Sequence, residues 1–198
     1  MTTAPADGRT ARKTVTRDAI ADALLDLLSE GHLRPTAREI AQRAGLSVRS
    51  VYVHFDDLDD LYCVSAGRAY ARVAPLLEPA SDTGSLRERA DALVRRRVQL
   101  FARIGGITRA TQRQAPFSPT LTRILRDAHN RSRREIEHVF ARELDDLPAR
   151  RREHVVGIIS VLTRSQALDL LREAHKFTDE DVTESIVDAI VAVLEAAA

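Results

Sequence analysis

The chain has 198 residues, and its 44% hydrophobic content is enough to bury a real core in one or two domains. Its formal net charge is +1, so any affinity for nucleic acid must come from local groups of basic residues and not from the whole molecule. One cysteine excludes an internal disulfide and disfavours a cysteine-based metal site, and the absence of a signal-peptide core or a membrane-length apolar run predicts a cytoplasmic protein.

The N-terminal segment, residues 1–13, is predicted to be a flexible basic arm. Its first residues are small and polar, and the basic side chains that follow are Arg9, Arg12, Lys13 and Arg17. Such an arm can reach DNA phosphates or an adjacent groove, and it can equally be an ordinary solvated terminus. Thr14 or Thr16 is then predicted to cap a first helix with a buried stripe over residues 20–28.

Residues 36–55 predict two short helices joined by a tight turn. Thr36 and Glu39 form a capping box, in which each side chain satisfies a free backbone N–H of the other residue. Gly45 stands where a helix end needs positive φ, and Ser47 is a good N-cap for the second helix. This pattern is typical of a helix-turn-helix, whose second helix enters the DNA major groove.

The second of these helices is predicted to be two-faced. The positions i, i+3, i+4 and i+7 predict an inward stripe of Val48, Val51, Tyr52 and Phe55. The residues left for the outer face and its flank are Arg49, Ser50, Val53 and His54.

Residues 16–61 resemble the DNA-binding domain of the TetR family of bacterial repressors. The most specific part of the resemblance is Gly45-Leu46-Ser47 followed by the run Val51-Tyr52-Val53-His54-Phe55. One position departs from the family, which usually has a phosphate-binding lysine where this chain has Leu58. The neighbouring carboxylates, which suit a helix start but repel phosphate, are Asp56, Asp57, Asp59 and Asp60.

Several residues of this segment are candidate DNA contacts. Arg49 is the best candidate for base readout, because an arginine can pair with guanine through two hydrogen bonds. Val48 and Val53 can contact thymine methyl groups or simply pack. Hydroxyl or imidazole donors suited to phosphate are carried by Thr36, Ser47, Ser50, Tyr52 and His54.

The rest of the chain predicts further helices and no strand. Helices are expected over residues 57–72, from Ser85 to a stop at Gly105 and Gly106, over residues 107–115, and after Ser118, Pro148 and Thr178. The predicted fold is all-α with about nine helices. Residues 14–60 would form a three-helix DNA-binding domain and residues 61–198 a helical ligand-binding and dimerisation domain.

The last two predicted helices are apolar on more than one face, so they are either central core helices or half of a two-fold interface. The TetR resemblance implies a homodimer formed by these helices, and the symmetry of a dimer implies a palindromic operator. The residues predicted for this interface are Val155, Ile159, Leu162, Ile186, Ala189, Ile190 and Val193.

The resemblance also implies that the C-terminal helices enclose a pocket for a small-molecule effector. Arg97 lies on an apolar stripe, so its charge needs a partner, which is either a ligand carboxylate or a neighbouring acidic residue. Further lining candidates, each of which is also a candidate core residue, are Phe101, Ile107, Phe117, Leu121, His129 and Leu162.

Two other functions compete with this interpretation. A helical di-iron enzyme would use a Glu-x-x-His pair such as Glu135 and His138, but it needs that motif twice and the chain has it once. A helix-turn-helix regulator that is controlled by a protein partner or acts as an activator fits the same residues. We therefore predict no enzyme, catalytic residue, metal or cofactor, and a repressor that a small ligand releases from its double-stranded DNA operator.

Overall fold

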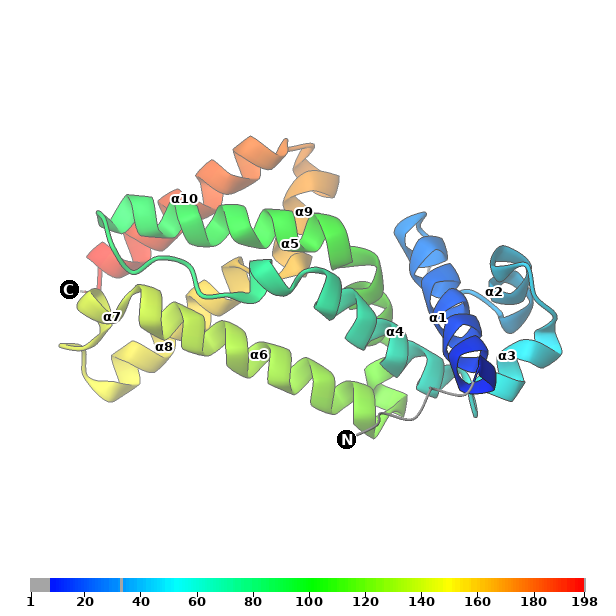
Figure 1. The fold of residues 1–198 in the computed structure, drawn as a ribbon. Coiled ribbons are helices and arrows are strands. Elements are labelled where there is room, and N and C mark those ends of the chain that lie inside the picture. Colours follow the sequence, from blue (N-terminus) through cyan, green and yellow to red (C-terminus); the bar gives the residue numbers. More distant parts are fainter. Residues whose placement is uncertain (1–7, 33, 198) are drawn as a thin grey trace, which may run out of the picture. The chain divides into compact units, whose positions relative to one another are not determined.

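The computed structural model describes residues 8–32 and 34–197, with side chains from Thr10 onward. These residues form ten α-helices and no strand, which confirms the predicted all-α class (Figure 1). The helices are α1 (Gly8–Ser29), α2 (Ala37–Ala44), α3 (Val48–His54), α4 (Leu58–Arg72), α5 (Leu86–Gln114), α6 (Pro119–Val139), α7 (Ala141–Leu144), α8 (Ala149–Leu162), α9 (Ser165–His175) and α10 (Asp179–Glu195), with two 3₁₀ turns, η1 (Ala74–Leu77) and η2 (Ala115–Phe117). None of the helices in the described part of the chain is long and apolar enough to span a membrane.

The chain divides into two compact units. The first contains the described residues up to Arg72 together with Gly106–Arg123, and the second contains Val73–Gly105 together with the residues from Ile124 onward. The predicted boundary between residues 60 and 61 falls inside α4, and the whole of α4 belongs to the first unit.

Helix α1 is the scaffold of the first unit, because it contacts α2, α3 and α4. It begins at Gly8, earlier than the caps predicted at Thr14 and Thr16. The hydroxyls of these two threonines instead donate to carbonyls four residues earlier, at 3.1 and 3.0 Å, as hydroxyls do inside a helix. Residues 8–13 of the predicted arm are therefore helical, and residues 1–7 lie outside the described part of the chain.

Helix α5 runs without a break through Gly105 and Gly106, where the sequence predicted a stop. A Cβ atom on Gly106 would lie 2.5 Å from the carbonyl oxygen of Leu28 near the end of α1. The glycine is required because the backbones of α1 and α5 approach too closely for a side chain. The predicted helix over residues 107–115 is the last part of α5.

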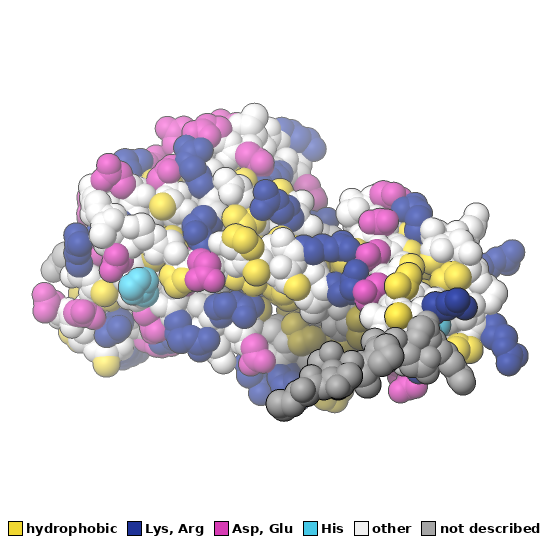
Figure 2. All heavy atoms as spheres, viewed as in Figure 1, with side chains coloured by type: hydrophobic (Ala, Val, Ile, Leu, Met, Phe, Trp, Pro, Cys, Tyr) yellow, Lys and Arg dark blue, Asp and Glu magenta, His cyan; other side chains and the backbone are white. Residues whose placement is uncertain are grey.

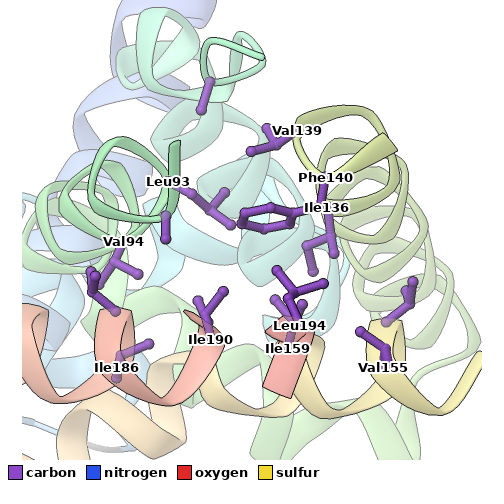
Figure 3. Close-up of a cluster of buried hydrophobic side chains, with 14 of the residues drawn as sticks. Leu93, Val94, Ile136, Val139, Phe140, Val155, Ile159, Ile186, Ile190 and Leu194 are labelled. Atoms are coloured by element: carbon purple, nitrogen blue, oxygen red, sulfur yellow. The ribbon is translucent and has the colours of Figure 1, made fainter. Parts of the chain in front are cut away.

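The second unit is built around an apolar core (Figure 3). Side chains from α5, α6, α8 and α10 meet there, and those shown include Leu93, Ile136, Phe140, Ile159 and Ile190, none of which is exposed. Each such side chain stabilises the fold by about 1.5–3 kcal/mol relative to leaving it in water.

Candidate DNA-binding surface

The turn between α2 and α3 has the predicted geometry. The N–H of Thr36 donates to Glu39 Oε2 at 2.7 Å, and the N–H of Glu39 donates to Thr36 Oγ1 at 3.3 Å, so the capping box is confirmed. The Thr36 donors also hold the pKa of the Glu39 carboxyl below its ordinary value. Gly45 has φ of +68°, and Ser47 Oγ accepts the N–H of Ser50 at 3.2 Å and caps α3.

Helix α3 buries a narrower face than predicted. Val51 and Phe55 are buried, as expected. Val48 is exposed, and so is Tyr52, with 55% of its surface accessible, so the prediction that these two side chains face inward is wrong. The reason is that α3 packs mainly against α1 and α2, and in a helix this short Val51 and Phe55 are enough to cover that contact.

The outer face of α3 therefore carries a continuous group of exposed side chains. Val53 is 63% exposed, and Arg49 is exposed with no hydrogen bond or ion pair to any residue that the structure describes. In Figure 2, basic and acidic side chains are interspersed over the visible face of each unit. Any preference for DNA must therefore come from a local group of residues such as the outer face of α3, which we define as Val48, Arg49, Tyr52 and Val53.

Arg17, which the sequence grouped with the basic arm, is engaged in contacts within the first unit. Its guanidinium donates to the backbone carbonyl of His54 and to the carboxylate of Asp60, at 3.2 Å to each oxygen, and lies 4.2 Å from the centroid of the Phe55 ring. These contacts tie α1 to the end of α3 and the start of α4. The ring Nδ1 of His54 is buried with no partner among the described residues, so that atom is not a phosphate donor.

The acidic residues after α3 have structural roles. Asp57 Oδ1 accepts the N–H of Asp60 at 2.8 Å and caps α4, which confirms the prediction that this cluster starts a helix. Asp59 accepts a hydrogen bond from Ser118 Oγ at 2.8 Å, a contact that the sequence did not predict. Leu58, in the position of the family's lysine, is half-buried.

The remaining candidate DNA contacts differ in whether their side chains already have hydrogen-bond partners within the protein. The Thr36 hydroxyl donates to Glu39 at 2.7 Å, so only the N–H groups at the start of α2 are left for phosphate there. The hydroxyls of Ser47 and Ser50 bond each other at 2.9 Å. Arg12 and Lys13 are exposed on α1, whereas the side chain of Arg9 lies outside the described residues. Sequence reasoning missed Arg38, which is exposed on the first turn of α2 and could have been found from its place two residues after the cap.

No protein-family model matches the chain, and no curated protein matches its sequence. Solved structures do match. A transcriptional regulator from Rhodococcus sp. aligns with a TM-score of 0.73 and 22% identity over 91% of this chain and 97% of its own. A TetR-family transcriptional regulator from Streptomyces coelicolor aligns with a TM-score of 0.72 and 22% identity, covering 93% of this chain and 82% of its own. A TetR transcription regulator from Haloarcula marismortui aligns with a TM-score of 0.68 and 18% identity, covering 93% and 98%. The chain has the TetR-regulator fold.

Within this TetR-regulator fold, the structure shows what Arg97 binds. Arg97 is buried, and its Nη2 donates to Ser132 Oγ at 2.9 Å and to Glu135 Oε2 at 2.5 Å. Burial lowers the pKa of Arg97, and the Glu135 carboxylate opposes that shift. The partner of Arg97 in this structure is therefore an acidic residue of the chain, the second of the two alternatives that the sequence left open. Glu135 also accepts the N–H of Ala80 at 3.1 Å, so it is engaged in the fold.

The other predicted ligand contacts do not form one pocket. Ile107 and Leu121 are buried in the first unit. Phe101 and Leu162 pack against the core of the second unit. His129 Nδ1 lies 2.7 Å from Arg164 Nη2. Phe117 is 86% exposed and lines a cavity in the first unit.

The predicted interface of the last two helices also changes. The four residues that are buried in the core of their own unit, and so are not available to a second copy, are Val155, Ile159, Ile186 and Ile190. Leu162, Ala189 and Val193 are half-buried. Helix α8 instead exposes Ile158 and Val161, one turn apart, and the latter is 65% accessible.

Proposed function

We propose that this protein is a sequence-specific DNA-binding transcriptional regulator in which α3 is the recognition helix. The observation that carries the proposal is the outer face of α3, where Arg49 is exposed and unpaired among the described residues, beside the exposed Val53. The TetR-regulator fold and the Gly45-Leu46-Ser47 turn support it.

The side chains on this face fit the major groove. The Arg49 guanidinium can donate two hydrogen bonds to O6 and N7 of guanine, and the methyl groups of Val48 and Val53 can contact thymine. The N–H groups at the starts of α2 and α3 can bind phosphate, with Arg12, Lys13 and Arg38 supplying positive charge that makes binding salt-dependent.

We further propose that two copies bind one palindromic operator. Ile158 and Val161 of α8 are exposed to water. A second copy placed across a two-fold axis would bury both side chains in a dimer interface. Such a dimer places two recognition helices in major grooves about 34–36 Å apart, or a multiple of that distance. Repression then follows from occupying a promoter, and an effector releases the protein by binding better to a conformation that fits DNA poorly.

The test is a binding titration of the protein against the DNA that flanks its own gene, at two salt concentrations and with scrambled competitor. We expect binding that survives the competitor and weakens with salt. Arg49→Ala should relax the preference for one base position by about 1–3 kcal/mol. The matched control is Arg142→Ala, which removes an exposed arginine from α7 in the second unit and should change nothing. If Arg49→Ala changes the affinity for every tested sequence by the same factor, so that the base preference is unchanged, the role of Arg49 in base readout is contradicted.

A further inference from the structure

The first unit contains a small cavity at the start of α4. Its walls come from the link between α1 and α2, the first turns of α4, and the end of α5 with η2. Its volume is about 240 Å³. Drug-sized ligands occupy pockets of roughly 300–1,000 Å³, so an occupant here must be smaller than these.

Three side chains make the cavity apolar over most of its lining: Pro35, Leu58 and Phe117. Phe117 is 86% exposed, which is unusual for so large an apolar side chain. Leu58 takes the position in which the resembling family has a lysine, so the departure from the family pattern adds an apolar wall. An apolar group bound in this cavity would shield both Leu58 and Phe117 from water.

The cavity also carries one positive and one negative side chain, Arg34 and Asp59. They do not pair with each other, and Arg34 has no hydrogen bond or ion pair to any residue of the described ranges. Asp59 accepts one hydrogen bond, from Ser118 Oγ at 2.8 Å, and a carboxylate has capacity for more. A ligand with both charges would satisfy both groups, whereas a simple anion or cation would meet one repulsive neighbour.

Tyr62 supplies a second donor. It lines the cavity, is 3% exposed, and its hydroxyl is buried with no hydrogen-bond partner among the described residues. Burial raises the pKa of Tyr62, so the hydroxyl keeps its proton at neutral pH and can donate it. Buried hydroxyls in native proteins normally have a partner, which a ligand carboxylate or a water held by it would provide here.

We propose that this cavity binds a small zwitterion with an apolar body, of the class of apolar α-amino acids. The ligand carboxylate pairs with Arg34, the ammonium group with Asp59, and the side chain lies against Leu58 and Phe117. The cavity is separate from the residues around Arg97, whose charge is already paired within the second unit.

A ligand bound in this cavity would affect the DNA-binding unit through its contact with Asp59 on α4. Ser118 Oγ both donates to Asp59 and accepts the N–H of Leu121 at 3.1 Å, so the same hydroxyl caps α6 and ties it to α4. A ligand ammonium bound to Asp59 shares the carboxylate with Ser118 and neutralises its charge, which weakens the hydrogen bond that links the two helices. This regulatory consequence rests on the proposed function, but binding to the cavity does not.

The experiment is a calorimetric titration of the full chain with L-phenylalanine and L-leucine. The matched probes are 3-phenylpropanoate, which lacks the ammonium group, phenethylamine, which lacks the carboxylate, and glycine, which lacks the apolar side chain. We expect saturable binding of the two amino acids and much weaker binding of all three probes. Arg34→Gln should weaken L-phenylalanine binding about tenfold or more without weakening phenethylamine. The control is Arg38→Gln, because Arg38 is an exposed arginine of the same unit outside the cavity lining.

Phe117→Ala gives a second variant that should fold, because the ring it removes is already in water. It should weaken L-phenylalanine binding and leave the unfolding midpoint unchanged. The proposal is overturned if neither amino acid binds saturably. It is also overturned if Arg34→Gln leaves the affinity for L-phenylalanine unchanged. These titrations contain no DNA, so their failure is distinct from failure of the DNA-binding proposal, which the operator titration reports. Adding L-phenylalanine to that operator titration should then change the operator affinity, and no change would refute the regulatory link through Asp59.

Discussion

Replacing Gly106 by alanine tests the close approach of α1 and α5. In an ordinary helix interior this change stabilises the protein by up to about 1 kcal/mol, because alanine is the better helix former. At Gly106 the new Cβ would lie 2.5 Å from the Leu28 carbonyl oxygen and 2.8 Å from its carbon, both inside normal contact distance. These are backbone atoms, so they cannot rotate away, and the end of α1 must move.

The two effects have opposite signs, and the clash should win. Overpacking a close contact costs about 1–3 kcal/mol, and a clash with rigid backbone belongs at the upper end of that range. After subtracting the gain in helix propensity, Gly106→Ala should destabilise the protein by about 1–2 kcal/mol. The matched control is Gly67→Ala in α4, where the residue is exposed and an added Cβ would meet no atom within 4 Å among the described residues. This control should stabilise the protein.

The assay is urea unfolding followed by circular dichroism, with both variants at the same protein concentration so that any dimerisation affects them equally. The expected result is a lower unfolding midpoint for Gly106→Ala and a higher one for Gly67→Ala. Stabilisation by both changes would refute the close approach and would favour a flexible joint at Gly105 and Gly106.

Three further outcomes follow from the contacts of the capping box, the buried ion pair and the exposed face of α8. The Thr36 donors hold the pKa of Glu39 below its ordinary value of 4.5. The capping box therefore stabilises the fold above about pH 4.5 and loses that effect as the pH falls through the lowered pKa. Glu39→Gln cannot titrate, so its unfolding temperature should fall less on acidification than that of the unmodified protein. Glu135→Ala leaves Arg97 buried without its carboxylate and should cost about 3–5 kcal/mol in urea unfolding, whereas Arg97→Met combined with Glu135→Leu should cost less; equal losses would show that the pair is not coupled. Val161→Asp should convert the proposed dimer to a monomer in sedimentation velocity, and an unchanged sedimentation coefficient would place the interface elsewhere.

The features predicted correctly from the sequence are those that depend on a few neighbouring residues. Each helix end around the turn is capped by residues within four positions of it, namely Thr36 with Glu39, Gly45, and Ser47. These patterns therefore identify the turn without knowledge of the fold. The helices predicted to start at Ser85 and Thr178 do so for the same reason, because Glu88 and Asp181 complete a capping box at each start.

The features predicted wrongly depend on segments far apart in the chain. Gly106 has the residue type of a helix stop, and only the position of Leu28 shows that it is a packing contact. Arg17 looks free in the sequence because its partners, His54 and Asp60, are 37 and 43 residues away. The prediction that Val48 faces the core rests on spacing alone, which gives the period of a helix but not the width of its contact.

The most direct test of DNA reading by α3 is selection of binding sites from a random pool of double-stranded DNA. The proposed dimer of recognition helices predicts an enriched inverted repeat whose half-sites are about one helical turn or a multiple apart. Repeating the selection with Arg49→Ala should relax one guanine-containing position in each half-site and leave the rest of the repeat intact. Failure to enrich any sequence, or enrichment of a site without two-fold symmetry, would contradict a dimeric protein that reads DNA through α3.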